Sequence, residues 1–220
     1  VSCAFDNICN VWSTQNFSLL GSYTGHTNFV FYGLTLSDGL RVASIGNDYM
    51  LRVWFWHNLT TQFVWSSGGM QLNALEQLAA NVLAVGMFDG TVRMFDLATG
   101  ASLPNISSLL KAGQGISGLR AYTNTTLLLV GNTANVALID WQTLALIGNN
   151  TDVGPSSLSR YEIAHSDGSV LIATTGINRL YNWDWRTGAV NFPFEIVQAG
   201  STFILFPSKY TFCVYKSLFC

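Results

Sequence analysis

Few residues of this chain have side chains that could do chemistry. The three histidines are His26, His57 and His165. His57 stands beside Asn58 in a stretch of turn composition, and we expect its imidazole to be solvated. His165 lies near Asp167 in the turn AHSDGS, and a turn of that composition needs no catalytic explanation. These two histidines therefore give no reason to expect a reaction centre.

Other patterns that would indicate catalysis are also missing from the sequence. No cysteine lies near a histidine along the chain, as a local thiolate and base would require. Glu76, Glu162 and Glu195 are too scattered to predict an acid and base pair, although residues distant in sequence can converge in space. The glycines of LATGASLP and GQGISG do not form a strand-to-helix phosphate cradle. We therefore expect no enzymatic activity and no cofactor.

Four cysteines lie at the two ends of the chain: Cys3, Cys9, Cys213 and Cys220. A two-residue turn at Asp6-Asn7 would place Cys3 opposite Asn10. The same turn would place Cys9 opposite Ala4, so the two thiols would point to opposite sides of the hairpin. We therefore expect bonds between N-terminal and C-terminal cysteines, within one molecule or between neighbours, with the connectivity left open. The alternative is four buried free thiols, and no CxxC or CxH spacing indicates a metal site.

Five asparagines lie in N-x-S/T sequons: Asn16, Asn58, Asn105, Asn124 and Asn149. Asn16 and Asn58 fall at equivalent places in two expected turns, Asn124 in a third turn, and Asn105 and Asn149 at the exits of expected outer strands. The alternative interpretation is that asparagine prefers turns in any protein. With scarce charge and terminal cysteines, we favour N-linked glycans and an oxidising, secretory setting.

The elements that position these residues are short strands. Residues 25–56 contain three apolar and β-branched runs, at 29–36, 40–45 and 50–56, separated by Ser37-Asp38-Gly39 and by a second turn at 46–49. This pattern predicts a three-stranded antiparallel meander. One meander cannot bury both of its faces, so the chain is expected to contain several.

The meander recurs along the whole chain. Val53-Trp54 aligns with Val11-Trp12, Met94-Phe95, Leu138-Ile139 and Asn182-Trp183, so the pattern repeats every 41 to 44 residues. Strands and turns at this period, without a helical pattern, predict the blades of a β-propeller.

The first full copy resembles the blades of WD-repeat β-propellers. In that family a glycine-histidine pair precedes the first strand and a serine lies on the second strand. An aspartate lies in the turn after the second strand, and a tryptophan followed by a final aspartate lies on the third strand. This copy supplies Gly25-His26, Ser44, Asp48 and Trp54, although Phe55 replaces the family's final aspartate. The resemblance implies a buried brace in which the histidine and turn amides donate to the aspartate.

The other copies keep fragments of this motif. Two copies keep the turn aspartate, at Asp6 and Asp89, and two keep the tryptophan, at Trp12 and Trp183. Three copies keep the aspartate that follows the tryptophan position on the third strand, at Asp96, Asp140 and Asp184. The resemblance implies a scaffold for protein–protein contacts. It also implies that seven blades are commoner than five.

We expect one propeller domain over residues 1–220. Its parts are a partial blade at 1–28, full blades at about 29–66, 71–103, 116–148 and 158–192, and a partial blade at 201–220. Cys213 and Val1 align with the same position, Ala43, so five blades would close with both termini in one shared blade. The same overlap would arise if two successive protomers shared a blade, and a fragment of a larger propeller is a further alternative.

The composition limits the partners of the chain. Only 10% of the residues are charged, against roughly 25% in an average soluble domain, so we expect glycans or neighbouring subunits to cover the surface. A net charge of −2 and only three lysines (Lys111, Lys209 and Lys216) argue against nucleic-acid binding. The longest apolar region, 127–147, is interrupted by polar residues and predicts strands, with no membrane span. Because the chain begins at Val1, we expect a processed protein or a portion of one.

These observations predict a non-enzymatic, five-bladed, WD-like propeller that binds other protein subunits, including copies of itself. The favoured setting is extracellular, as a secreted, N-glycosylated structural module of a fibre-like assembly. The first alternative is a cytoplasmic WD-repeat scaffold with free cysteines and no glycan. The second is a propeller enzyme or carbohydrate binder, which would need inward-facing carboxylates or histidines from several blades.

Overall fold

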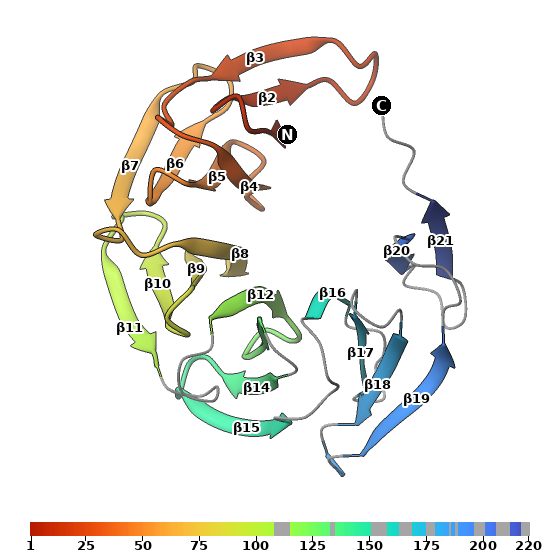
Figure 1. The fold of residues 1–220 in the computed structure, drawn as a ribbon. Coiled ribbons are helices and arrows are strands. Elements are labelled where there is room, and N and C mark those ends of the chain that lie inside the picture. Colours follow the sequence, from red (N-terminus) through yellow and green to blue (C-terminus); the bar gives the residue numbers. More distant parts are fainter. Residues whose placement is uncertain are drawn as a thin grey trace. The chain divides into compact units, whose positions relative to one another are not determined.

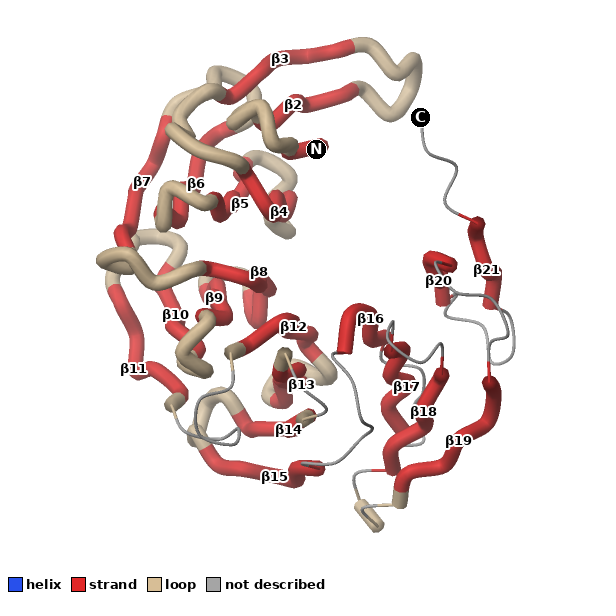
Figure 2. The backbone as a smooth tube through the Cα atoms, in the orientation of Figure 1, coloured by secondary structure: helices blue, strands red, loops and turns tan. Residues whose placement is uncertain are grey.

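The computed structural model describes residues 1–107, 115–132 and 135–150, followed by 158–162, 169–174, 179–184, 186–187, 189–195, 201–205 and 212–216. Every regular element in these residues is a β-strand (Figure 2). The strands form four four-stranded antiparallel sheets, one three-stranded sheet and one two-stranded sheet. The predicted all-β class is confirmed. Among the described residues, no helix has the length and apolarity needed to cross a bilayer.

The chain divides into two compact units, Val1–Ser107 and Ser108–Cys220. Unit 1 holds three sheets, and in each of them strands that are neighbours in sequence pair with one another (Figure 1). The first sheet has β1 (Ser2–Cys3), β2 (Cys9–Trp12) and β3 (Leu19–Tyr23). The second has β4 (Val30–Thr35), β5 (Arg41–Gly46), β6 (Met50–Phe55) and β7 (Thr61–Ser66). The third has β8 (Leu72–Ala79), β9 (Val82–Met87), β10 (Val92–Asp96) and β11 (Ser102–Ile106).

Unit 2 repeats the same strand order. One sheet has β12 (Ile116–Ala121), β13 (Thr126–Gly131), β14 (Val136–Asp140) and β15 (Ala145–Asn150). The next has β16 (Leu158–Glu162), β17 (Ser169–Thr174), β18 (Arg179–Asp184) and β19 (Val190–Glu195). The last pairs β20 (Ser201–Leu205) with β21 (Phe212–Lys216).

The sheets share an irregularity as well as an order. In every four-stranded sheet the first strand shifts register against the second within its first residues, at Val30/Tyr32, Leu72/Ala74, Ile116/Gly118 and Leu158/Arg160. A bulge adds local twist and is specified by the sequence around it. A bulge that recurs at the same place indicates that the four sheets are copies of one structural unit.

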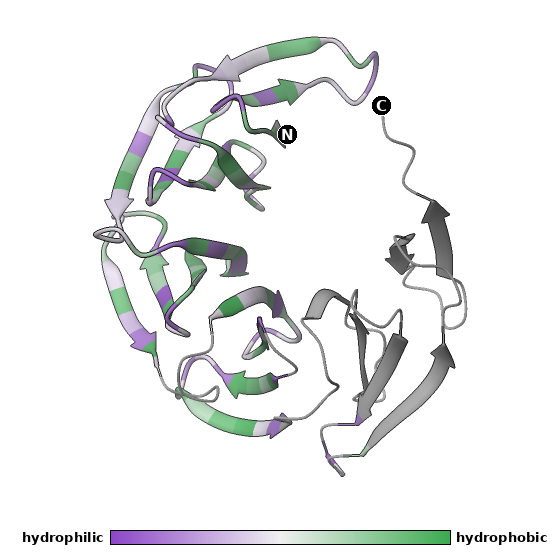
Figure 3. Ribbon diagram, viewed as in Figure 1, coloured by the Kyte–Doolittle hydropathy of each residue, from purple (hydrophilic) through white to green (hydrophobic). Residues whose placement is uncertain are grey.

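The core of unit 1 lies between consecutive sheets. On β6, Leu51 and Val53 pack in a cluster with Val85 and Phe95 of the third sheet. Trp54 points to the opposite face of β6, where it packs with residues of the first sheet, including Val11 and Tyr23. Both faces of the second sheet are therefore buried. This explains why apolar residues on both faces of its central strands are buried, namely Val42, Ala43 and Ile45 on β5 and Leu51, Val53 and Trp54 on β6. Figure 3 colours the strands by hydropathy, with green hydrophobic bands on the sheets of unit 1.

The structure corrects the predicted cysteine pairing. Cys3 lies directly opposite Cys9, with a Cα–Cα distance of 4.1 Å, and the two residues form a disulfide. The predicted two-residue turn is wrong, because the connection runs from Ala4 to Ile8, where Ala4 N–H donates to the Ile8 carbonyl at 3.2 Å. Asn7 takes a left-handed conformation with φ of 71°. The longer connection shifts the register by one residue, which moves both thiols to the same side of the hairpin.

This disulfide uses both N-terminal cysteines, so the expected bonds from Cys3 or Cys9 to the C-terminal cysteines are wrong. Cys213 lies on β21, where its backbone pairs with Ile204. Cys220 lies outside the described residues.

Candidate functional site

The four residues of the WD-like motif lie together between the first and second sheets. His26 Nδ1 lies 2.9 Å from Asp48 Oδ2, and His26 Nε2 lies 2.8 Å from Ser44 Oγ. Trp54 Nε1 donates to the same hydroxyl oxygen at 3.1 Å. The structure therefore joins His26, Ser44, Asp48 and Trp54 in one hydrogen-bonded chain, which we call the brace.

The proton arrangement in the brace follows from its partners. The Asp48 carboxylate accepts only, so His26 Nδ1 carries the proton that it donates. Ser44 Oγ accepts from Trp54, so its own proton is free to go to Nε2 of a neutral imidazole. A protonated His26 would leave the Ser44 hydroxyl with two donors and no acceptor. The brace is complete only with neutral His26.

Burial favours the same state. Desolvation lowers the pKa of His26 below its usual 6.5, and the positive charge of Arg52 acts in the same direction. The hydrogen bond and charge of Asp48 oppose this shift without cancelling it.

Backbone groups and an aromatic ring complete the site. Asp48 also accepts from Thr27 N–H at 3.2 Å and from Met50 N–H at 3.2 Å, so it joins the loop before β4 to the turn between β5 and β6. The Tyr23 ring stacks on Trp54 with a centroid distance of 4.3 Å and an interplanar angle of 3°. Its hydroxyl lies 2.7 Å from Thr61 Oγ1. Through Tyr23, the first sheet therefore contacts both the brace and β7 of the second sheet.

The order serine, histidine, aspartate is that of a nucleophilic triad. Here the Ser44 side chain is 0% exposed, and its oxygen already accepts from Trp54. No substrate carbonyl can reach that oxygen. The arrangement can hold two sheets together, but it cannot attack a substrate.

The next pair of sheets uses apolar residues at the same positions. Ser44 pairs across the strands with Arg52, and Val85 pairs likewise with Arg93. Phe95 takes the place of Trp54 and contacts Trp65 at 5.0 Å. The aromatic contact between sheets is therefore retained, whereas the hydrogen bonds are replaced by packing.

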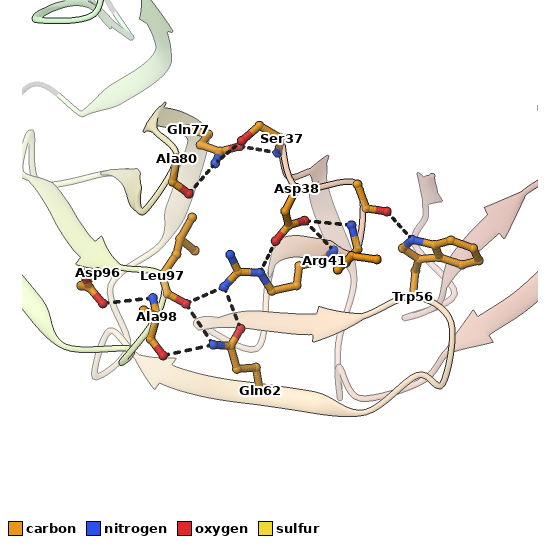
Figure 4. A network of polar contacts seen from close by, with 12 residues as sticks. Ser37, Asp38, Arg41, Trp56, Gln62, Gln77, Ala80, Asp96, Leu97 and Ala98 are labelled. Carbon is orange, nitrogen blue, oxygen red and sulfur yellow. Dashed lines mark hydrogen bonds and ion pairs between the residues drawn. The ribbon is translucent and has the colours of Figure 1, made fainter.

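A second polar network links the second and third sheets on the side of the β4–β5 turn (Figure 4). Arg41 Nη1 donates to the Leu97 carbonyl at 2.6 Å and to Gln62 Oε1 at 3.1 Å. Gln62 Nε2 donates to the same Leu97 carbonyl at 2.9 Å. Asp38 accepts from Arg41 Nε and holds the guanidinium in place. We call this set, Asp38, Arg41, Gln62 and the Leu97 carbonyl, the Arg41 clamp.

The Arg41 clamp is extended by a glutamine on β8. Gln77 Oε1 accepts from Ser37 N–H at 2.7 Å, and Gln77 Nε2 donates to Ser37 Oγ at 2.9 Å. Partial burial acts against ionisation of Asp38, but hydrogen bonds from Leu40 and Arg41 outweigh it and lower the pKa of Asp38. The sequence analysis predicted neither the Arg41 clamp nor its extension through Gln77, because both join residues from different repeats.

Three aromatic rings gather on the surface of unit 1. Phe5 lies 5.1 Å from Phe29 and 6.5 Å from Phe31 between ring centroids. Phe5, Phe29 and Phe31 are 69%, 44% and 37% exposed. Contacting apolar rings at a surface are typical of a protein contact site. We call these three residues the aromatic cluster, which was missed because phenylalanine in a strand pattern suggests a core residue.

The five sequon asparagines are all exposed. Asn16 and Asn58 lie in the turns that join β2 to β3 and β6 to β7, and Asn124 lies in the β12–β13 turn. Asn105 and Asn149 are the penultimate residues of β11 and β15. Within the described part of the chain, no three His, Cys, Asp or Glu side chains gather as a metal site would require.

Comparison with known proteins assigns no family. No protein-family model matches the sequence, and a search of curated proteins found no significant match.

Proposed function

We propose that the repeated sheets are WD-like blades of a β-propeller of about five blades, with both termini contributing to the closing blade. The shared strand order and the recurring first-strand bulge support this proposal. The brace supports the resemblance to the WD family, since it joins the four residues that the resemblance implies. Class averages of the purified particle test the arrangement: discs with a central channel are expected, and an elongated pair of separate bodies would overturn it.

The proposed function is a non-enzymatic scaffold that associates with copies of itself through the aromatic cluster. The exposure of three contacting rings carries this proposal. Phe31 lies on β4, Phe29 lies directly before this strand, and Phe5 lies in the connection between β1 and β2. The disulfide and the brace fix the two sheets that carry these rings. A rigid apolar patch loses little conformational entropy on binding, which favours association.

The proposed setting is extracellular, with the chain serving as a secreted module of a larger assembly. A disulfide between Cys3 and Cys9 is expected to persist in an oxidising compartment, and five exposed sequons suit a secreted protein. The intracellular scaffold of the alternative would keep free thiols.

Sedimentation velocity over a range of concentrations tests the contact. We expect wild-type protein to associate as its concentration rises, and the triple variant Phe5→Ser, Phe29→Ser, Phe31→Ser to remain monomeric. Phe88→Ser is the matched control, because Phe88 is 51% exposed and precedes a turn aspartate as Phe5 does. Equal association of the triple variant and wild type would overturn the proposed contact.

A further inference from the structure

We propose that Asn16 and Asn58 are the modified pair among the five sequons, each carrying an N-linked glycan on an equivalent turn of adjoining sheets. This inference rests on the proposed secretory setting. The two turns differ from every other described turn of their kind in how they are closed, and that difference places the acceptor amide.

The two turns have nearly the same geometry. Asn16 Oδ1 accepts from Ser18 N–H at 3.1 Å and from Ser18 Oγ at 2.8 Å. Asn58 Oδ1 accepts from Thr60 N–H at 3.1 Å and from Thr60 Oγ1 at 2.7 Å. In both sequons the hydroxyl residue therefore touches the side-chain amide to which a sugar would be attached.

The residue between asparagine and hydroxyl makes this contact possible. Phe17 and Leu59 have φ values of 58° and 59°, in the left-handed region. That conformation folds the chain back, so the third residue of the sequon reaches the first. A large side chain rarely adopts it, and the asparagine hydrogen bonds offset part of its cost.

Corresponding turns elsewhere are closed by other groups. Asp96 accepts from Ala98 and Thr99 N–H, and Asp140 accepts from Gln142 and Thr143 N–H. Where the sequon turns have asparagine, the β10–β11 turn has Thr99, whose Oγ1 accepts from Ala101 N–H at 3.2 Å.

The same threonine contact recurs once more. Thr187 Oγ1 accepts from Ala189 N–H at 3.2 Å. The chain therefore shows that threonine can close this turn without a sequon.

The asparagine geometry leaves the acceptor nitrogen available. Both turn-closing bonds go to Oδ1, and among the described residues neither Asn16 Nδ2 nor Asn58 Nδ2 makes a hydrogen bond.

In the transfer of the glycan, Nδ2 bonds to the anomeric carbon of a lipid-carried glycosyl diphosphate. The carbon–oxygen bond to diphosphate breaks, diphosphate leaves with the electron pair, and one Nδ2 proton passes to a base of the transferase. Oδ1 keeps its role in the turn.

Two other sequons lack this contact among the described residues. Asn105 is the penultimate residue of β11, where residues two apart are separated by roughly 6–7 Å along the strand. Asn149 lies within β15, and Thr151, the hydroxyl residue of its sequon, lies outside the described residues. Asn124 lies in a turn in which Thr126 N–H donates to Thr123 Oγ1, and the described structure shows no bond from the Thr126 hydroxyl to Asn124. All three asparagines are exposed, but neither Asn105 nor Asn124 is paired with the hydroxyl of its sequon in the described structure.

Site mapping on the full chain tests the inference. The chain would be expressed with a signal peptide and secreted from a eukaryotic cell. Its glycopeptides would be treated with an amidase in heavy-oxygen water, which removes each glycan and leaves a labelled aspartate at the modified site. We expect the heavy label at Asn16 and Asn58. Asn16→Thr and Asn58→Thr should each remove one glycan, and the double variant should still be secreted, because threonine closes the same turn at Thr99.

The outcomes separate the two proposals. Label confined to Asn105, Asn124 or Asn149 would overturn the inference and leave the secretory setting intact. A secreted chain without label at any of the five sites would remove the glycosylated setting and the inference with it. If the double variant is not secreted, the label map on wild-type protein still decides.

Discussion

His26 Nε2 lies 2.8 Å from the Ser44 hydroxyl, at the centre of a buried chain that requires a neutral imidazole. Since burial lowers the pKa of His26 in the folded state, the unfolded chain binds a proton more readily than the folded one. The stability contributed by neutral His26 is therefore fully present above the unfolded pKa of 6.5. It is lost as the pH falls below that value toward the lower folded pKa.

We expect the free energy of unfolding to fall between pH 7 and pH 5, by at most about 1.4 kcal/mol per pH unit from this group. Urea unfolding across that range measures the effect. His26→Gln should flatten the pH dependence while lowering stability throughout. An unchanged slope in His26→Gln would contradict the assignment.

Replacing the brace with the apolar pair of the next sheet should show that its members are coupled. Ser44→Val leaves Trp54 Nε1 and His26 Nε2 without partners, at a cost of about 1–3 kcal/mol for each buried group. Trp54→Phe removes the indole Nε1, which is one of these two groups. The double variant, which reproduces Val85 and Phe95, should lose less stability than the sum of the single variants. Additive losses in urea unfolding would contradict a shared chain of bonds.

The strand pattern could be predicted because it is local. Short apolar runs separated by turn residues such as Ser37-Asp38-Gly39 specify each hairpin. The repeat period then allows the same hairpins to be predicted in the next sheet. The brace was implied by the resemblance to WD-repeat blades, which could be noticed because His26, Ser44 and Asp48 lie within one repeat.

The features that were missed depend on longer range or on a single backbone conformation. The Arg41 clamp joins residues up to 56 positions apart, and no local pattern marks that contact. The disulfide was missed because the β1–β2 connection, in which Asn7 is left-handed, is longer than the predicted two-residue turn and pairs Cys3 with Cys9. A shift of one residue exchanges the two faces of a strand, so a small error in the turn reversed the predicted cysteine pairing.

The Arg41 clamp should contribute measurably to the contact between the second and third sheets. Arg41→Met removes the Nη1 donor to Gln62 and the Leu97 carbonyl, and it removes the Nε donor to Asp38. We expect the free energy of unfolding to fall by about 1–2 kcal/mol. Arg41→Lys should recover little, because one ammonium group cannot match the planar guanidinium that contacts Asp38 and the Leu97 carbonyl together. Urea unfolding measures both losses, and wild-type stability in Arg41→Met would show that the clamp is dispensable.

A final prediction concerns Gly33, which lies on β4 against the disulfide. A Cβ atom at this position would lie 2.5 Å from Cys3 Sγ, closer than any normal contact. Gly33→Ala should therefore cost about 1–3 kcal/mol when the disulfide is present. In a Cys3→Ala, Cys9→Ala background the sulfur is absent, so the same substitution should cost much less.

Gly39→Ala provides the control for Gly33→Ala. Gly39 has φ of +69° and no atom within 4 Å of the added Cβ, so its cost of about 1 kcal/mol comes from the backbone. That cost should be the same with and without the cysteines. The cysteine substitutions alone should cost about 2 kcal/mol, since the closed loop is short. If thermal unfolding showed the same loss for Gly33→Ala in both backgrounds, close packing of β4 against the disulfide would not be the cause.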